Sequence, residues 1–272
     1  MPPRKRKILM LTYNKLGSYG RLGNQMFQIA STIGIAKSNN ITVGFNTWIC
    51  SYSKKKYEQY LMDTLPKLGV LNIDLTISEK GFQYSNIILP KNKNIDLKGY
   101  FQSEKYFENC AKEIKSLFTL NKFEKNKIIT KYPEIHTNET CSIHIRRGDY
   151  LNLQGHHPVI NKAYYESALN ILYPSGLTDV TILIFSDDIE WCKNNICFPT
   201  KIIFVEGNDD ILELFLMSYC KNNIIANSSF SWWAAWLNIN PEKKIIAPKE
   251  WFGEKNKHLN TSDIYCKDWI KL

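Results

Sequence analysis

Hydrophobic and polar positions in the second half of the chain follow patterns that predict strands alternating with helices. Residues 141–146 alternate between apolar and polar side chains and stop before a glycine, which is typical of a strand. Residues 180–185 form a nearly continuous apolar run, as expected for a strand covered on both faces. Shorter strands are predicted at 201–205, 223–226 and 244–247, with helices at 162–172, after 186–188, after 208–209 and at 230–237. This alternation indicates a parallel sheet with helices on both faces.

The first half of the chain opens in the same way but is less regular. A strand is predicted at 7–12 and a helix at 22–36, joined by a loop that contains Gly17 and Gly20. The pattern also predicts strands at 41–45 and 87–89 and a helix at 103–118. The polar segment 121–140 has little periodicity and is interpreted as the connection between two lobes. We therefore expect an N-terminal domain at residues 1–135 and a C-terminal domain at residues 136–272.

Composition and charge narrow the class of protein. The chain has 272 residues, of which 44% are hydrophobic and 22% charged, so it can bury a core of its own. Its net charge of +9 suits an anionic ligand: a nucleic acid, a membrane surface or a phosphorylated small molecule. A basic surface with no such ligand is the alternative. The chain contains no continuous apolar run of the roughly 18–20 residues that a transmembrane segment needs.

Cysteine usage favours a reducing compartment. The seven cysteines are scattered and form no C-x-x-C pair. The short apolar run at residues 8–11 is also below the roughly 7–15 residues of a signal-peptide core. We therefore expect a cytoplasmic protein with free thiols, membrane-peripheral placement being left open, and no glycan at Asn138, Asn227 or Asn260.

Two adjacent arginines follow the strand predicted at 141–146. Ligands of open α/β sheets bind beyond the carboxyl ends of the strands, where Arg146, Arg147, Gly148 and Asp149 are expected. Guanidinium groups bind phosphate in a bidentate manner, so this pair is a candidate diphosphate clamp. The alternative is an Arg–Asp pair that only fixes a turn.

Two further strand ends carry candidate ligand groups. Residues 227–231, Asn-Ser-Ser-Phe-Ser, open a helix whose N-terminus favours an anion, whereas the tryptophans that follow are expected in the core. Asp187 and Asp188 follow another strand, where one carboxylate could accept two N–H groups from a guanine edge. Capping of the next helix is the alternative for either carboxylate.

Two classes of cofactor are disfavoured. The turn Gly20-Arg21-Leu22-Gly23-Asn24-Gln25 is similar to a dinucleotide fingerprint but is not G-x-G-x-x-G, so a nicotinamide cofactor is a weak interpretation. No acidic triplet has metal-ligand spacing, and the five histidines form no cluster in the sequence. We expect no metal site, which leaves arginines to neutralise a departing phosphate.

Four segments together resemble the α-1,2-fucosyltransferases of glycosyltransferase family 11. In order along nearly the whole chain they are 20–28 (GRLGNQMFQ), 99–107 (GYFQSEKYF), 144–149 (HIRRGD) and 227–237 (NSSFSWWAAWL). The third and fourth are highly specific. One departure is Arg21, where the family usually has a glycine.

The resemblance implies a GT-B-like α/β fold: two Rossmann-like lobes with parallel sheets and a ligand cleft between them. The N-terminal lobe would lie on the acceptor side and the C-terminal lobe on the donor side. The implied reaction transfers L-fucose from GDP-β-L-fucose, with inversion, to the 2-hydroxyl of a terminal β-galactoside. GDP-fucose is then a co-substrate, and no cofactor or metal is required.

The resemblance also assigns roles to matching residues. Arg146 would bind the β-phosphate, and Arg147 would hold the loop or assist. Ser228, Ser229 and Phe230 would offer hydroxyl and backbone N–H groups to the phosphates.

The remaining donor-binding residues follow the strand predicted at 180–185 or lie in the first of the four segments. Asp187 or Asp188 would read guanine. Asn24 and Gln25 would form the opposite wall of the site.

The catalytic base stays open at this point. Asp149 is the first candidate by its place in the motif and His144 the second, while a base-free mechanism is a third possibility. Acceptor choice is expected to depend on the N-terminal lobe and on loops such as 48–60 and 152–158.

Other functions remain as alternatives. They are a transferase for another GDP-sugar, such as a protein O-fucosyltransferase, and a non-catalytic module that binds nucleotide or glycan. Nucleic-acid binding ranks last, because the basic residues are dispersed along the chain rather than gathered on one element.

Overall fold

A computed structural model describes residues 9–57, 65–68, 71–137 and 139–272. The first residues of the strand expected at 7–12, the end of loop 48–60 and the sequon at Asn138 lie outside these residues. The chain divides into two compact units: unit 1 runs to Thr119 and includes Ser262–Ile264, and unit 2 holds Leu120–Thr261 and Tyr265–Leu272. The sequence placed the division at residues 135 and 136, whereas this division assigns the helices between 122 and 137 to unit 2.

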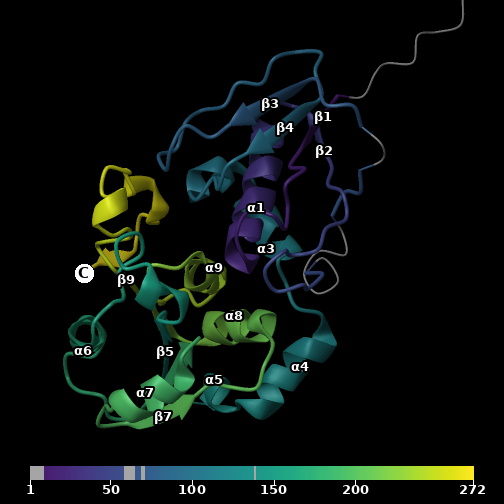
Figure 1. Cartoon of the computed structure of the whole chain (residues 1–272). Helices are drawn as coiled ribbons and strands as arrows, with labels where there is room; N and C mark the ends of the chain where they lie inside the picture. The colour runs from purple at the N-terminus through teal and green to yellow at the C-terminus, as the bar shows by residue number, and fades with distance from the viewer. Residues whose placement is uncertain (1–8, 58–64, 69–70, 138) are drawn as a thin grey trace, which may run out of the picture. The chain divides into compact units, whose positions relative to one another are not determined.

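Unit 1 is built on a four-stranded parallel sheet in the order β2-β1-β4-β3 (Figure 1). Its elements are β1 (Met10–Thr12), α1 (Leu22–Ser38), β2 (Thr42–Val43), β3 (Leu75–Ser78), β4 (Ile95–Lys98), the 3₁₀ turns η1 (Glu104–Tyr106), η2 (Glu108–Cys110) and η5 (Ser262–Ile264), and α3 (Ala111–Leu117). The helix predicted at 22–36 is confirmed by α1, and the strands expected at 7–12 and 41–45 correspond to β1 and β2.

Helix α1 forms the core of unit 1. Nearly all of its residues from Leu22 to Ala36 are buried, and the buried polar side chains of Gln28, Ser31 and Thr32 each donate to a backbone carbonyl. Gly34 allows the segment of η1 and η2 to pack directly on α1. A Cβ at this position would lie 2.6 Å from the Cα of Phe107 and would overlap the carbonyl oxygen of Tyr106.

Unit 2 contains a six-stranded parallel sheet in the order β10-β9-β8-β5-β6-β7. Its elements are α4 (Lys122–Lys131), α5 (Glu134–Thr137), β5 (Glu139–Ile145), η3 (Asp149–Asn152), α6 (Lys162–Leu172), β6 (Val180–Ser186), α7 (Ile189–Asn195), β7 (Lys201–Phe204), α8 (Asp210–Tyr219), β8 (Asn222–Ile224), α9 (Ser229–Leu237), β9 (Ile245–Ala247), η4 (Glu254–Asn256) and β10 (Ile270–Lys271). Each strand and helix predicted from 141 to 247 is confirmed within a few residues, and β10 is an addition.

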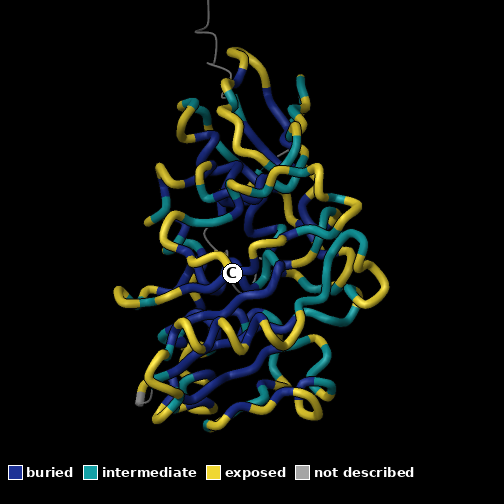
Figure 2. Tube along the Cα trace, turned by 90° about the vertical axis from the view of Figure 1, so that its left-hand side faces the viewer, coloured by how far each residue is buried: buried dark blue, intermediate teal, exposed yellow. Residues whose placement is uncertain are grey.

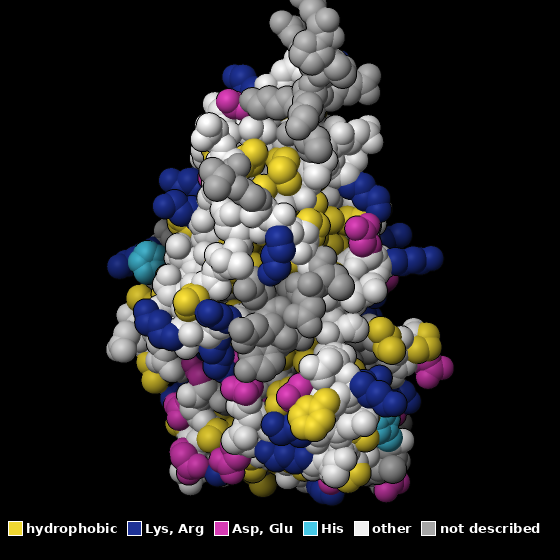
Figure 3. Space-filling model, turned by 90° about the vertical axis from the view of Figure 1, so that its right-hand side faces the viewer, with side chains coloured by type: hydrophobic (Ala, Val, Ile, Leu, Met, Phe, Trp, Pro, Cys, Tyr) yellow, Lys and Arg dark blue, Asp and Glu magenta, His cyan; other side chains and the backbone are white. Residues whose placement is uncertain are grey.

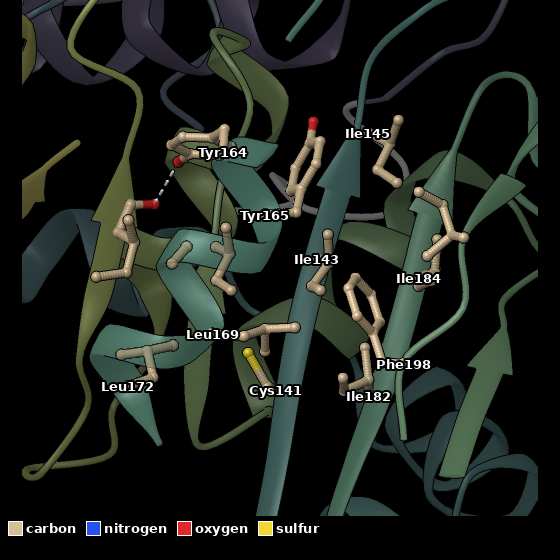
Figure 4. Packing of buried hydrophobic residues seen from close by; sticks show 14 of the residues in the cluster. Cys141, Ile143, Ile145, Tyr164, Tyr165, Leu169, Leu172, Ile182, Ile184 and Phe198 are labelled. Carbon is tan, nitrogen blue, oxygen red and sulfur yellow. Dashed lines mark hydrogen bonds between the residues drawn. The ribbon is translucent and has the colours of Figure 1, made fainter. Parts of the chain in front are cut away.

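The sheet of unit 2 is covered on both faces. On one face, α6 and α7 pack against apolar side chains of β5 and β6, with Ile143 and Ile184 among those fully buried (Figure 4). On the other face lie α8 and α9 (Figure 1). The tryptophans of α9 are buried, as predicted. Figure 2 colours each residue by its burial, with buried residues inside the fold and exposed residues along its outside. The polar groups at the strand ends are thereby carried on a rigid support.

Two predictions for unit 1 are wrong. Residues 87–89 are not a strand, because Asn39 at the end of α1 bonds their backbone: its amide donates to the carbonyl of Ile87 and its oxygen accepts the N–H of Leu89. Residues 103–118 are not one helix but two 3₁₀ turns followed by α3, since packing against Gly34 interrupts the helical path.

The segment 121–140, expected to connect the two lobes, contains regular structure and belongs to unit 2. Residues 122–131 form α4, whose N-terminus is capped by the side chain of Asn121, and α5 and the start of β5 follow. Ile128 is the one residue of α4 that is buried, so the helix carries no apolar stripe and its periodicity is weak.

Charge on the surface is mixed. On the face in Figure 3, Lys and Arg side chains are interspersed with Asp and Glu and do not form a single stripe. In the described part of the chain, no helix combines the length and apolarity that crossing a membrane requires.

Candidate functional site

The carboxyl ends of three neighbouring strands bring the predicted donor-binding residues of unit 2 together. Strand β5 lies between β8 and β6, and all three are parallel, so their ends meet at one edge of the sheet. The chain runs outward from β5 through β6 to β7, then returns to β8 on the other side. The strand order therefore reverses between β5 and β8, which is where open α/β sheets bind ligands.

Arg146 is held between two carboxylates. Its Nη2 donates to Asp149 Oδ1 at 2.6 Å, and its Nη1 lies 3.0 Å from Asp187 Oδ2. The side chain is only 15% exposed. Because a guanidinium carries five N–H groups, these two contacts leave further donors for phosphate oxygens.

Arg147 is fixed in a different way. Its guanidinium carbon lies 3.7 Å from the ring centroid of Trp191, and its Nε donates to Asp188 Oδ2 at 3.3 Å. This side chain therefore fastens the loop after β5 to α7, which agrees with a loop-holding role more than with direct phosphate contact.

Both aspartates after β6 already have partners in the protein. Asp187 Oδ1 accepts the backbone N–H of Arg147 at 2.9 Å, and a Cβ at Gly148 would overlap its Oδ2, so a larger residue there would displace this carboxylate. Asp188 Oδ1 caps α7 by accepting the N–H of Trp191 at 3.3 Å. The sequence suggested that one of the two carboxylates stays available to guanine, but in the structure each is bonded to an arginine.

The turn after β8 opens α9 at the same edge. Ser228 is the N-cap and its hydroxyl accepts the N–H of Phe230 at 3.3 Å. Ser228, Ser229 and Phe230 are all partly exposed. The first N–H groups of a helix lack intrahelical partners, so this turn can donate to an anion.

His144 lies beneath this edge rather than at its surface. It is 4% exposed, and its Nδ1 lies 2.9 Å from the hydroxyl of Ser231. Burial, with a smaller contribution from Arg146, lowers the pKa of His144 to about 3, so the ring is neutral. This geometry ties β5 to the first turn of α9, which suits a positioning role better than proton abstraction.

Asn24 and Gln25 belong to unit 1, while the other nine predicted residues belong to unit 2. The Asn24 side-chain oxygen accepts a hydrogen bond from Gln102 at 2.7 Å. Gln25 is fully buried, accepting from the Trp48 indole at 2.9 Å and donating to the carbonyl of Gly20 at 3.2 Å. A role for Gln25 in donor binding would therefore act through the shape of its loop.

Two aromatic residues of the site were missed from the sequence. Trp191 stacks on Arg147, and the ring of Tyr150 lies against Arg146. The available signals were the position of Tyr150 directly after the HIRRGD segment and of Trp191 one turn after Asp188. Neither signal reveals an aromatic contact without the tertiary structure.

Neither unit shows a metal-binding cluster or a disulfide among its described residues. The described residues contain no group of three or more His, Cys, Asp or Glu side chains placed to hold a metal ion. All seven cysteines are free thiols.

Comparison with known proteins gives a consistent result. The model of "Glycosyl transferase family 11" matches residues 4–272. An Escherichia coli alpha-1,2-colitosyltransferase is 30% identical over 295 residues, which cover 93% of this chain and 96% of the relative. A Caenorhabditis elegans galactoside 2-alpha-L-fucosyltransferase is 27% identical over 98% of this chain and 81% of the relative.

Solved structures share the fold. NodZ, an alpha-1,6-fucosyltransferase of Bradyrhizobium, superimposes in its GDP-fucose-soaked crystal with a TM-score of 0.57 at 13% identity, over 85% of this chain and 93% of that chain. The expectation of a GT-B-like α/β fold with parallel sheets is confirmed.

Proposed function

This chain belongs to glycosyl transferase family 11, and on that premise we propose that it transfers L-fucose from GDP-β-L-fucose to the 2-hydroxyl of a terminal β-galactoside, forming an α-1,2 linkage with inversion. The observation that carries the proposal is the juxtaposition of Arg146 with the N-terminus of α9 at the reversal of strand order in unit 2. Both groups donate hydrogen bonds to anions, as a departing diphosphate requires.

The chemistry follows from where charge develops. When the bond between fucose and the β-phosphate breaks, negative charge accumulates on the phosphate oxygen. Fixed donors stabilise this charge most in the transition state, and therefore raise kcat rather than only binding the donor. We assign this role to Arg146, with Ser228, Ser229 and Phe230 binding the remaining phosphate oxygens.

A single displacement with inversion needs at most one base. We propose Asp149 as this base. Its side chain is 42% exposed and can be reached by an acceptor, and it lies beside Arg146, whose side chain is 15% exposed. His144, the second candidate, is buried and bonded to Ser231. Departure without a base is the remaining alternative. We also expect catalysis without a divalent metal, with the arginine taking the charge.

The donor has one close competitor. The Escherichia coli relative is a colitosyltransferase, and colitose differs from fucose by lacking the 3-hydroxyl. A site that hydrogen-bonds this hydroxyl would reject colitose strongly, whereas a site that does not would accept both sugars. We propose fucose as the donor sugar and GDP-colitose as the comparison that tests it.

The test is transfer from GDP-fucose or GDP-colitose to a panel of galactosides, including lactose and N-acetyllactosamine, and to a folded polypeptide acceptor. The product linkage is determined by NMR, and a parallel reaction contains EDTA. An α-1,2-fucosyl product in both conditions supports the proposal. Transfer only to a polypeptide would favour a protein O-fucosyltransferase, and GDP binding with no transfer to any acceptor would favour a binding module.

Arg146→Ala tests the role of the arginine. We expect a fall in kcat on the order of 10²–10³-fold with the melting temperature nearly unchanged. Lys201→Ala is the matched control, since it removes one positive charge from the first residue of β7, at the amino edge of the same sheet. Activity retained by Arg146→Ala would contradict the phosphate-binding role.

A further inference from the structure

The side chain of Tyr150 contacts both anion-binding elements of unit 2. The guanidinium carbon of Arg146 lies 5.3 Å from the centroid of its ring, within the roughly 6 Å range of a cation–π contact. The phenol hydroxyl donates to the carbonyl oxygen of Asn227 at 3.0 Å. Tyr150 therefore links the loop after β5 to the turn after β8, across the reversal of strand order.

The ring of Tyr150 is held in place by a second loop. His157 stacks on it nearly in parallel, with ring centroids 4.8 Å apart and an interplanar angle of 18°. Phe252 packs against His157 with centroids 5.6 Å apart. Burial lowers the pKa of His157, so a neutral ring lies beside Tyr150 and adds no positive charge near Arg146.

Backbone hydrogen bonds fasten this second loop. The N–H of Gly253 donates to the carbonyl of His156 at 2.9 Å, and the N–H of Lys255 donates to that of Gly155 at 2.8 Å. The Asn227 amide also donates to the carbonyls of Pro158 and Trp251. Tertiary packing, and not a free rotamer choice, therefore sets the orientation of Tyr150.

We propose that Tyr150 is a positioning residue that holds the Arg146 guanidinium and the turn at Asn227 in the arrangement that binds the donor diphosphate. This rests on the proposed function, because it assumes that Arg146 binds GDP. Tyr150 itself touches no reacting atom in this scheme and acts through the two groups that it connects.

Two substitutions separate its two contacts. Tyr150→Phe keeps the ring against Arg146 but leaves the Asn227 carbonyl without this donor, and we expect GDP to bind about 3- to 10-fold more weakly. Tyr150→Leu removes the ring as well, and we expect a loss of about 10- to 100-fold in GDP affinity and in kcat/KM for the donor. The KM for the acceptor should stay within twofold.

Tyr164→Phe is the matched control. The hydroxyl of Tyr164 also donates to backbone carbonyls in unit 2, those of Ile225 at 2.8 Å and Ile246 at 3.2 Å. Its removal costs a buried hydrogen bond of the same kind and should lower the melting temperature. The Kd for GDP should remain within twofold of wild type, because Tyr164 is not part of the link to Arg146.

A double-mutant cycle with Arg146→Lys, with Kd for GDP measured by calorimetry on the full chain, decides between positioning and general stability. In the Arg146→Lys background, Tyr150→Leu should cost no more than Tyr150→Phe costs in wild type, about 3- to 10-fold, since the contact between ring and guanidinium is already gone and only the hydrogen bond to Asn227 is lost. Equal losses in both backgrounds, or a wild-type Kd in Tyr150→Leu, would overturn the proposal. Should Tyr150→Leu not fold, Tyr150→Phe decides: a wild-type Kd for GDP in that variant would overturn the link through Asn227. A wild-type chain that does not bind GDP would instead overturn the proposed function.

Discussion

Mild acid should destabilise unit 2 through one buried histidine. His144 is 4% exposed, its Nδ1 lies 2.9 Å from the Ser231 hydroxyl, and burial and Arg146 lower its pKa from 6.5 to about 3. The folded state therefore excludes the charged ring, while the unfolded chain accepts a proton near pH 6.5. Stability is complete above this value and is lost progressively as the pH falls toward the folded-state pKa.

The size of the effect follows from the two pKa values. Each pH unit below 6.5 costs about 1.4 kcal/mol while the folded state stays neutral, so lowering the pH from 7.5 to 5 removes about 2 kcal/mol. With a urea dependence of about 2 kcal/mol/M, the midpoint of unfolding should fall by about 1 M. This window lies mostly above the range in which carboxylates titrate. Burial also lowers the pKa of His157 in unit 2, so the difference between wild type and His144→Asn gives the contribution of His144.

Urea unfolding followed by tryptophan fluorescence measures the midpoint for unit 2, because every tryptophan except Trp48 belongs to that unit. His144→Asn keeps an oxygen near the position of Nδ1 and does not titrate, so its midpoint should fall by about 1 M less than wild type over the same pH range. His258→Asn removes an exposed histidine as the control. Parallel curves for wild type and His144→Asn would refute the assignment of a buried, neutral His144.

Two further substitutions test the packing and the chemistry. Gly34→Ala should lower the free energy of unfolding by about 2 kcal/mol or more in a denaturant melt, because the added methyl group meets backbone of Tyr106 and Phe107; an unchanged value would contradict this close approach. Asp149→Asn should lower kcat about 10²–10⁴-fold if its carboxylate accepts the proton of the acceptor hydroxyl, whereas GDP binding should weaken far less, since Asp187 still holds Arg146. A fall of less than tenfold in single-turnover kinetics would favour departure without a base.

The fold of unit 2 could be predicted because each element carries its own signal. Strand β6 is a nearly continuous apolar run, helix α6 buries one stripe, and helix α8 is apolar and buried over most of its length. Short loops between such elements leave few topologies possible, and the strong preference for right-handed crossovers between parallel strands reduces their number further.

Unit 1 was harder to predict because polar side chains replace sheet contacts there. Strand β4 contains Asp96, which is 8% exposed and accepts the N–H of Asn14 at 2.8 Å, so the strand does not read as an apolar run. The apolar residues 87–89 look like a strand, but the side chain of Asn39 satisfies their backbone groups. Such long-range pairings leave no trace in local periodicity.

In the candidate site, too, features with a local sequence signal could be predicted and features set by long-range contacts could not. That Arg146, Asp187 and Ser228 follow strand ends could be predicted, and parallel strands then place them at one edge. The order of the strands in the sheet could not be predicted, because the return of the chain from β7 to β8 depends on the packing of the whole sheet. The ion pair between Arg146 and Asp187 follows from that order alone.

The charges around Arg146 and Arg147 bear on how the site can work. Three carboxylates, Asp149, Asp187 and Asp188, contact these two guanidinium groups, so the pair does not present an unbalanced positive patch. Their attraction for GDP at long range is therefore weak, and ground-state binding gains little from net charge. The carboxylates instead fix the orientation of the guanidinium groups, so that their remaining N–H groups point in a set direction. Donors fixed before the reaction need no reorganisation when charge appears on the leaving phosphate. This arrangement therefore favours a large effect on kcat, and on the binding of free GDP that already carries that charge, over a large effect on affinity for the intact GDP-sugar.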